Sequence, residues 1–91
     1  MTVQCVSLLH SREARFELLG RMKAHGLKLR MHAFEYLIAR RGFACILLLE
    51  PAWNKAHIFR MKWNAEEADR VSELITEILI KVDPGIEIDL E

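Results

Sequence analysis

Short runs of apolar residues along the chain predict several β-strands. The most apolar run, Phe43–Leu49, has seven consecutive apolar residues and is typical of a buried strand. Residues 57–63 show the clearest alternation of apolar and polar positions, and residues 86–91 alternate in the same way. Thr2–His10 is rich in β-branched and small apolar residues. We therefore also predict a strand there.

Two segments have the 3.6-residue periodicity of amphipathic helices. Ser11 is a suitable N-cap for a helix that runs to about His25, and Gly26 is a natural left-handed stop. The second helix is predicted to begin after Asn64, with Glu67 at the spacing of a capping box. Asp83-Pro84-Gly85 ends it before the last strand.

The segment Leu27–Arg41 is compatible with two structures. As a helix, it lines up Met31, Phe34 and Ile38 at helical spacing. As a strand, it alternates, and Arg41-Gly42 can form the turn of a hairpin into Phe43–Leu49. Local propensity favours the helix, and this context favours the strand, which we adopt.

The resulting order is strand, helix, strand, strand, extra strand, helix, strand. This order predicts an α+β fold, a ferredoxin-like βαββαβ plait with one extra strand, in a single domain over residues 1–91. The alternative is a three-helix α+β domain in which residues 30–41 are helical.

The first 29 residues resemble the start of an ACT-type regulatory domain. The shared features are a strand, a polar loop, a helix and the exit His25-Gly26-Leu27-Lys28-Leu29 into a second strand. Such domains usually carry a glycine in the loop before the helix, where this chain has His10-Ser11-Arg12-Glu13. The resemblance is therefore one of pattern, and it does not extend to the loop of an amino-acid effector site.

The net charge of zero conceals two parts of opposite charge. Residues 1–62 carry eleven Lys and Arg against four Glu, a net charge of +7. Residues 63–91 carry two basic against nine acidic side chains, a net charge of −7. Such an asymmetry indicates either a basic surface for an anionic partner or complementary faces within an assembly.

Motifs of catalysis and metal binding are missing from the sequence. Cys5 and Cys45 are 40 residues apart, and no histidines are spaced as in structural zinc sites. The chain has no nucleophile elbow, P-loop or dinucleotide-binding glycine motif. We therefore expect no catalytic residues, no metal and no cofactor, and a chain that is not an enzyme.

The apolar runs and the cysteines also bear on location. The longest apolar run is too short to span a bilayer, which takes about 20 residues. We therefore expect no membrane contact. A pair of cysteines without a secretion signal is typical of a reducing compartment, so we expect a cytoplasmic protein.

The most informative stretch for partners is Trp53–Trp63, in which aromatic residues alternate with basic ones. One hypothesis is a basic-aromatic strand that binds RNA or DNA. The alternation, however, places Phe59, Met61 and Trp63 most simply in the core, with the basic residues in water. The favoured hypothesis is a small non-catalytic homodimer that binds a protein or small ligand in a regulatory or accessory role, because one face of Phe43–Leu49 has no evident cover. The candidate partner-binding residues are Trp53, Phe59, Arg60, Lys62 and Trp63, with Arg40 and Arg41 as a second basic site.

Overall fold

The computed structural model describes residues 8–91 of the chain. Two α-helices, five β-strands and three single-turn 3-10 helices make up its regular structure. In chain order they are η1 (Leu8–His10), α1 (Arg12–Ala24), β1 (Lys28–His32), β2 (Glu35–Ala39), β3 (Phe43–Glu50), η2 (Pro51–Trp53), β4 (Lys55–Arg60), η3 (Lys62–Asn64), α2 (Ala65–Val82) and β5 (Glu87–Leu90).

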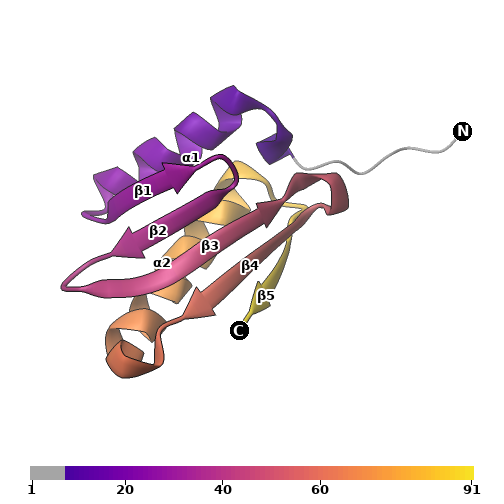
Figure 1. Cartoon of the computed structure of the whole chain (residues 1–91). Helices are drawn as coiled ribbons and strands as arrows, with labels where there is room; N and C mark the ends of the chain where they lie inside the picture. Colours follow the sequence, from indigo (N-terminus) through magenta and orange to yellow (C-terminus); the bar gives the residue numbers. More distant parts are fainter. Residues whose placement is uncertain (1–7) are drawn as a thin grey trace, which may run out of the picture.

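The five strands form one sheet in which the spatial order follows the chain order, β1-β2-β3-β4-β5 (Figure 1). The first four strands pair antiparallel with their neighbours. β5 pairs parallel with β4, because the chain returns along α2 before it enters β5. β1 and β5 are therefore the two edges of the sheet.

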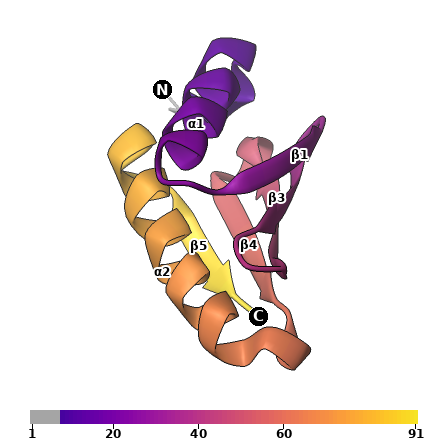
Figure 2. The same cartoon turned by 90° about the vertical axis from the view of Figure 1, so that its left-hand side faces the viewer.

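Both α-helices pack on the same face of the sheet (Figure 2). Alternate strand residues point toward them, so the core lies between the sheet and the helices. Its fully buried side chains include Tyr36, Ile38, Cys45, Leu47 and Ile58 from the strands and Leu18, Met22, Val71, Ile75 and Leu79 from the helices. Among residues 8–91, no element covers the opposite face of the sheet (Figure 2).

The predicted α+β class is confirmed, but the ferredoxin-like plait order is not. The observed order is α-β-β-β-β-α-β. In a split βαβ plait another strand separates the two strands joined by a helix, whereas β4 and β5 are direct neighbours here. Residues 2–7 of the strand predicted over Thr2–His10 lie outside the described residues, and Leu8–His10 form the turn η1 instead.

Residues 28–39 form a two-stranded hairpin, so the helical alternative for residues 30–41 is wrong. The single predicted strand is divided by a two-residue turn, in which Ala33 has a φ of 54°. Met31 pairs with Tyr36 and Leu29 pairs with Ile38. These two apolar sets, which alternate on opposite faces of one long strand, lie on the same face of a hairpin. Burial against the helices thus outweighs the local helix propensity.

The predicted N-cap and C-terminal stop of α1 are confirmed, whereas the predicted capping box of α2 is wrong. The Ser11 hydroxyl accepts a hydrogen bond from the Ala14 amide at 3.1 Å, which confirms the N-cap of α1. Gly26 has a φ of 83°, as the left-handed stop requires. α2 has no capping box, because the Asn64 side chain makes no cap hydrogen bond and the Glu67 carboxylate accepts one from Arg40 instead.

Candidate interaction surface

The face of the sheet that points away from the helices, here called the open face, has an apolar centre of four side chains. These are Leu37 on β2, Ile46 and Leu48 on β3, and Phe59 on β4, all half-buried. Leu37 pairs with Ile46, and Ile46 pairs with Phe59, so three of them form one row across the sheet. A row of this kind shields its members only from the side and leaves their outer surface in water.

Beside this centre the open face has a hollow of about 220 Å³ near β1. Lys28, Arg30, Leu37, Ala39 and Phe43 line it, together with Leu29. Phe43 reaches the hollow because the β2–β3 register shifts between Ile38 and Ala39, which sets Phe43 opposite Ala39. The hollow therefore joins an apolar floor to two cationic side chains.

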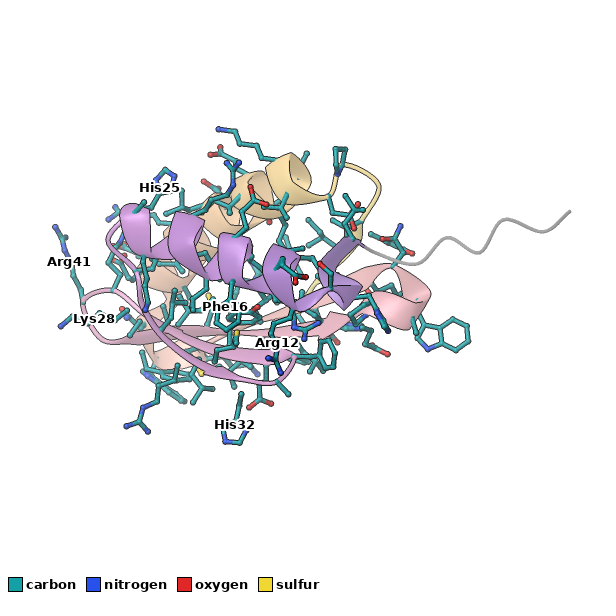
Figure 3. The ribbon with its side chains drawn as sticks, turned by 90° about the horizontal axis from the view of Figure 1, so that it is seen from above. Arg12, Phe16, His25, Lys28, His32 and Arg41 are labelled. Carbon is teal, nitrogen blue, oxygen red and sulfur yellow. The ribbon has the colours of Figure 1, made fainter. Side chains whose placement is uncertain are left out.

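β1 gives the open face a basic edge, which consists of Lys28, Arg30 and His32. Leu29 and Met31, which alternate with them, pack against the core, so the three basic side chains point the other way. All three are exposed, and Figure 3 shows His32 projecting on the side of the sheet opposite the helices. Within residues 8–91, neither Lys28 nor Arg30 forms an ion pair.

β5 and the residue after it give the open face an acidic edge, which consists of Glu87, Asp89 and Glu91. Ile88 packs against the core, so its neighbours point to the open face. The acidic edge contacts β4: Lys55 Nζ lies 4.0 Å from Asp89, and His57 Nδ1 lies 3.2 Å from Glu91. Along the row of Arg30, Leu37, Ile46 and Phe59 the open face thus changes from basic at β1, through apolar at its centre, to acidic at β5. Glu35, Glu50, Lys55 and His57 lie on the same face outside this row.

His57 is the most connected polar side chain of this face. Its Nε2 is bonded to Glu50, and its Nδ1 lies 3.6 Å from Asp89 as well as near Glu91. The ring also stacks on Phe59, with 6.3 Å between the ring centroids. Carboxylates on both ring nitrogens fix the orientation of the imidazole, and they join the acidic edge to the apolar centre.

The structure divides the predicted partner-binding residues between the two ends of β4. Trp53 lies in η2 before the strand, and Trp63 lies in η3 after it. They are 75% and 78% exposed, so the prediction that Trp63 faces the core is wrong. The core-facing residues of β4 are Ala56 and Ile58, and Phe59 belongs to the open face. No continuous basic-aromatic strand therefore links the two tryptophans.

The basic candidates gather at the end of the sheet that holds the β2–β3 turn and η3. Arg40 Nε donates to Glu67 at 2.6 Å, and Arg60 donates to Asp69 at 3.1 Å. Arg60 and Lys62 line a second hollow of about 220 Å³ with Met61, Ala65, Asp69 and Glu91. Arg41 is exposed in the turn (Figure 3). The first two arginines are neutralised by α2, which leaves Arg41 and Lys62 as cations without an ion pair among residues 8–91.

The sequence analysis does not single out Lys28, Arg30 and Leu37, which belong to the open face. A signal for the basic edge exists in Lys28-Leu29-Arg30-Met31-His32, where basic and apolar residues alternate strictly. For Ile46 and Leu48 the uncovered face of Phe43–Leu49 was such a signal. To predict that these residues lie on one surface requires the strand order, which the sequence pattern does not contain.

The thiol of Cys45 and the phenol of Tyr36 are both groups of the core. Cys45 is a free, fully buried thiol whose Sγ donates to the Ala68 carbonyl at 3.5 Å, and burial raises its pKa to about 11. Burial likewise raises the pKa of Tyr36 to about 12. At neutral pH both therefore stay protonated, and Cys45 is not a thiolate nucleophile.

Further observations bear on metals, membranes and relatives. Within the described part of the chain, no group of three or more His, Cys, Asp or Glu side chains is arranged to hold a metal ion. None of the helices over residues 8–91 is long and apolar enough to cross a membrane. Comparison of the chain with protein families, with curated proteins and with solved structures found no match. The open face itself is therefore the main guide to function.

Proposed function

We propose that the chain is a non-catalytic interaction module, which acts by forming a homodimer and by binding a protein or small ligand in a regulatory or accessory role. The observation that carries this proposal is the apolar centre of the open face. Four large apolar side chains lie side by side on a sheet face that no element of residues 8–91 covers. Contiguous apolar patches of this kind mark protein contacts more often than catalytic clefts.

The chemistry of the other groups supports a binding role. The buried thiol is protonated at neutral pH, and the two hollows are small and open to solvent. The charged residues of the basic and acidic edges border the apolar centre, where they are suited to orient a partner. A polar rim around an apolar centre is the usual anatomy of a protein interface.

The proposal is tested by measuring the molar mass in solution by light scattering and analytical ultracentrifugation, up to high micromolar concentration. We expect twice the chain mass of 10.6 kDa. Ile46→Glu, which puts a charge in the apolar centre, is expected to give a monomer with an unchanged circular dichroism spectrum. Ile80→Glu is the matched control, because Ile80 is 47% exposed on α2, away from the sheet. It is expected to leave the dimer intact.

Two results would count against the proposal. A wild-type chain that stays monomeric over the whole range contradicts the homodimer. A salt-dependent gel shift with single- or double-stranded probes that Arg60→Glu abolishes would favour the nucleic-acid alternative. The ion pair between Arg60 and Asp69 lowers the charge that this arginine can offer to phosphate, so we expect no such shift.

A further inference from the structure

The charges of the open face are arranged so that the face complements itself. The basic edge on β1 and the acidic edge on β5 lie on opposite sides of β3, which is the middle strand of five. The strands are about 4.8 Å apart, so each edge lies about 10 Å from β3. A surface that is positive on one side, apolar in the middle and negative on the other can pair with its own copy in a suitable orientation.

We propose that the occupant of the open face is a second copy of this chain, related by a two-fold axis that runs parallel to the strands over β3. This inference rests on the proposed homodimer and adds its orientation. A two-fold contact uses the same patch on both copies, so the patch must complement itself about the axis. Rotation about an axis along the strands places β1 of one copy over β5 of the other, which brings the basic edge to the acidic edge twice.

A two-fold axis perpendicular to the strands is disfavoured because it would oppose like charges. A two-fold axis that lies in the plane of the sheet but runs across the strands places β1 over β1 and β5 over β5. Lys28 and Arg30 would then face the same cations of the second copy, and the acidic edges would face each other. Like charges opposed in an interface cost several kcal/mol, so the charge pattern selects the axis along the strands.

The same axis also matches the interior of the face row by row. β2 lies over β4 of the second copy, which sets Leu37 opposite Phe59 and Glu35 opposite His57. Ile46 on the central strand meets Ile46 of the second copy. The cross-strand register places Arg30, Leu37, Ile46 and Phe59 in one row, so apolar groups meet apolar groups along the axis. Aligned packing of two sheets at about 10 Å and about −30° is the usual geometry for such faces.

The size of the face sets the expected affinity. Strands about 4.8 Å apart and about five residues of 3.3 Å long give a flat footprint of roughly 400 Å² per copy. The sum for two copies, about 800 Å² before the relief of the side chains is counted, is below the roughly 1,200–2,000 Å² of stable interfaces and in the range of weak, transient ones. We therefore expect a dimer that dissociates at micromolar concentration.

Pairing through the sheet edges is the competing arrangement, and it differs in stoichiometry. β1 of one copy beside β5 of the next would also satisfy the charges, but it would leave the apolar centre in water and would build an open-ended chain. β1 beside β1 would oppose Lys28 and Arg30 to themselves. A closed dimer whose mass does not grow with concentration therefore excludes β1–β5 pairing. Loss of the dimer in Ile46→Glu separates face packing from β1–β1 pairing, which leaves Ile46 outside the contact.

The test reverses the charge of each edge separately and then of both. Arg30→Glu with His32→Glu makes both edges acidic, and Asp89→Lys with Glu91→Lys makes both basic. The strand register sets Arg30 in the row of Glu91 and His32 in the row of Asp89, so these residues form the proposed edge contacts. Each double variant is expected to weaken the dimer at least about tenfold at low ionic strength, because both edge contacts become repulsive. The quadruple variant, with both edges reversed, is expected to dimerise nearly as well as the wild type. Arg12→Glu with Lys23→Glu is the control for net charge, since both residues are exposed on α1 and neither belongs to the open face, and it is expected to have little effect.

Mixing the quadruple variant with the wild type fixes the axis. With the axis along the strands, a mixed dimer opposes like edges, so native mass spectrometry should show the two homodimers and almost no mixed species. With the axis across the strands, the mixed dimer would be preferred, and this result would overturn the orientation. A wild-type dimer that none of the charge reversals affects would overturn it too and leave the homodimer standing. A monomeric wild type would remove both proposals, and a mass that grows with concentration would favour edge pairing.

Discussion

The ion pair between Arg40 and Glu67 joins the end of β2 to the first turn of α2, and its removal gives a sharp test of the packing. Arg40 Nε lies 2.6 Å from Glu67 Oε1, and the two side chains are 33% and 8% exposed. Arg40→Ala leaves the Glu67 carboxylate in a mostly dry site without its cation. Such a loss costs about 3–5 kcal/mol for a fully buried pair.

Two features of this site reduce that figure. One third of Arg40 is in contact with water, which screens the interaction. Glu67 also lies in the first turn of α2, where the helix dipole contributes about 0.3–1 kcal/mol in favour of a carboxylate. We therefore expect Arg40→Ala to lower the free energy of unfolding by about 1–3 kcal/mol. Glu67→Gln removes the negative charge and with it the need for a cation, so Arg40→Ala should cost much less in that background.

Urea unfolding followed by circular dichroism, at one protein concentration for all variants, measures these differences. The control is Arg21→Ala, which removes an ion pair of 3.1 Å with Glu17 on the exposed face of α1. Its side chains are 45% and 54% exposed, so we expect a loss of at most about 0.5 kcal/mol. Equal losses for Arg40→Ala and Arg21→Ala, or strict additivity of Arg40→Ala with Glu67→Gln, would refute the reasoning.

Three further predictions use the same unfolding measurement. Ser11→Ala removes the side-chain cap of α1 and is expected to cost about 1 kcal/mol, and no loss would contradict the observed cap. Gly20→Ala and Gly26→Ala should change the free energy of unfolding in opposite directions. A Cβ at Gly20 within α1 meets nothing within 4 Å, so Ala there should raise it by about 0.5–1 kcal/mol. The φ of 83° at Gly26 disfavours a side chain, so Ala there should lower it by about 1 kcal/mol. For Cys45, with a pKa raised from 9.0 to about 11, the unfolded state loses its proton first, so stability should fall as pH rises through 9 to 11. In a Cys5→Ser background, Cys45→Ala should remove that part of the pH dependence, and alkylation of Cys45 at pH 8 should follow unfolding; rapid reaction of the folded chain would contradict its burial.

The elements that the sequence predicted correctly are those whose pattern is local. Phe43–Leu49 lies within β3, residues 87–90 of the strand predicted over 86–91 form β5, and Ser11 caps α1. Each of these signals lies within a few neighbouring residues. The turn at Ala33 escaped prediction since neither Ala33 nor Phe34 is a typical turn residue, and only pairing of β1 with β2 makes a φ of 54° acceptable there. The class of fold was therefore predictable, and the strand order was not.

The candidate interaction surface was less predictable than the fold, because the strand order decides which residues lie on the open face. Phe59 was identified, but β4 has apolar residues on both faces, and only the position of the helices shows that Ile58 is the core residue. Trp53 and Trp63 suggested one aromatic strand, yet the strand spans only Lys55–Arg60. Trp53 lies in the 3-10 turn before it and Trp63 in the one after it. Alternation gives two faces and does not say which of them the helices cover.

The charge separation shows how topology can turn a sequence property into a surface property. Residues 8–42, which form α1, β1 and β2, carry eight Lys and Arg against three Glu, and residues 43–91 carry five against ten acidic side chains. Because the spatial order of the strands follows the chain order, the basic part forms one edge of the sheet and the acidic part forms the other. A sheet that interleaved early and late strands would mix these charges and remove the gradient. The opposed edges of the sheet therefore arise from the separation of charge along the chain, and the proposed orientation of the homodimer depends on this separation.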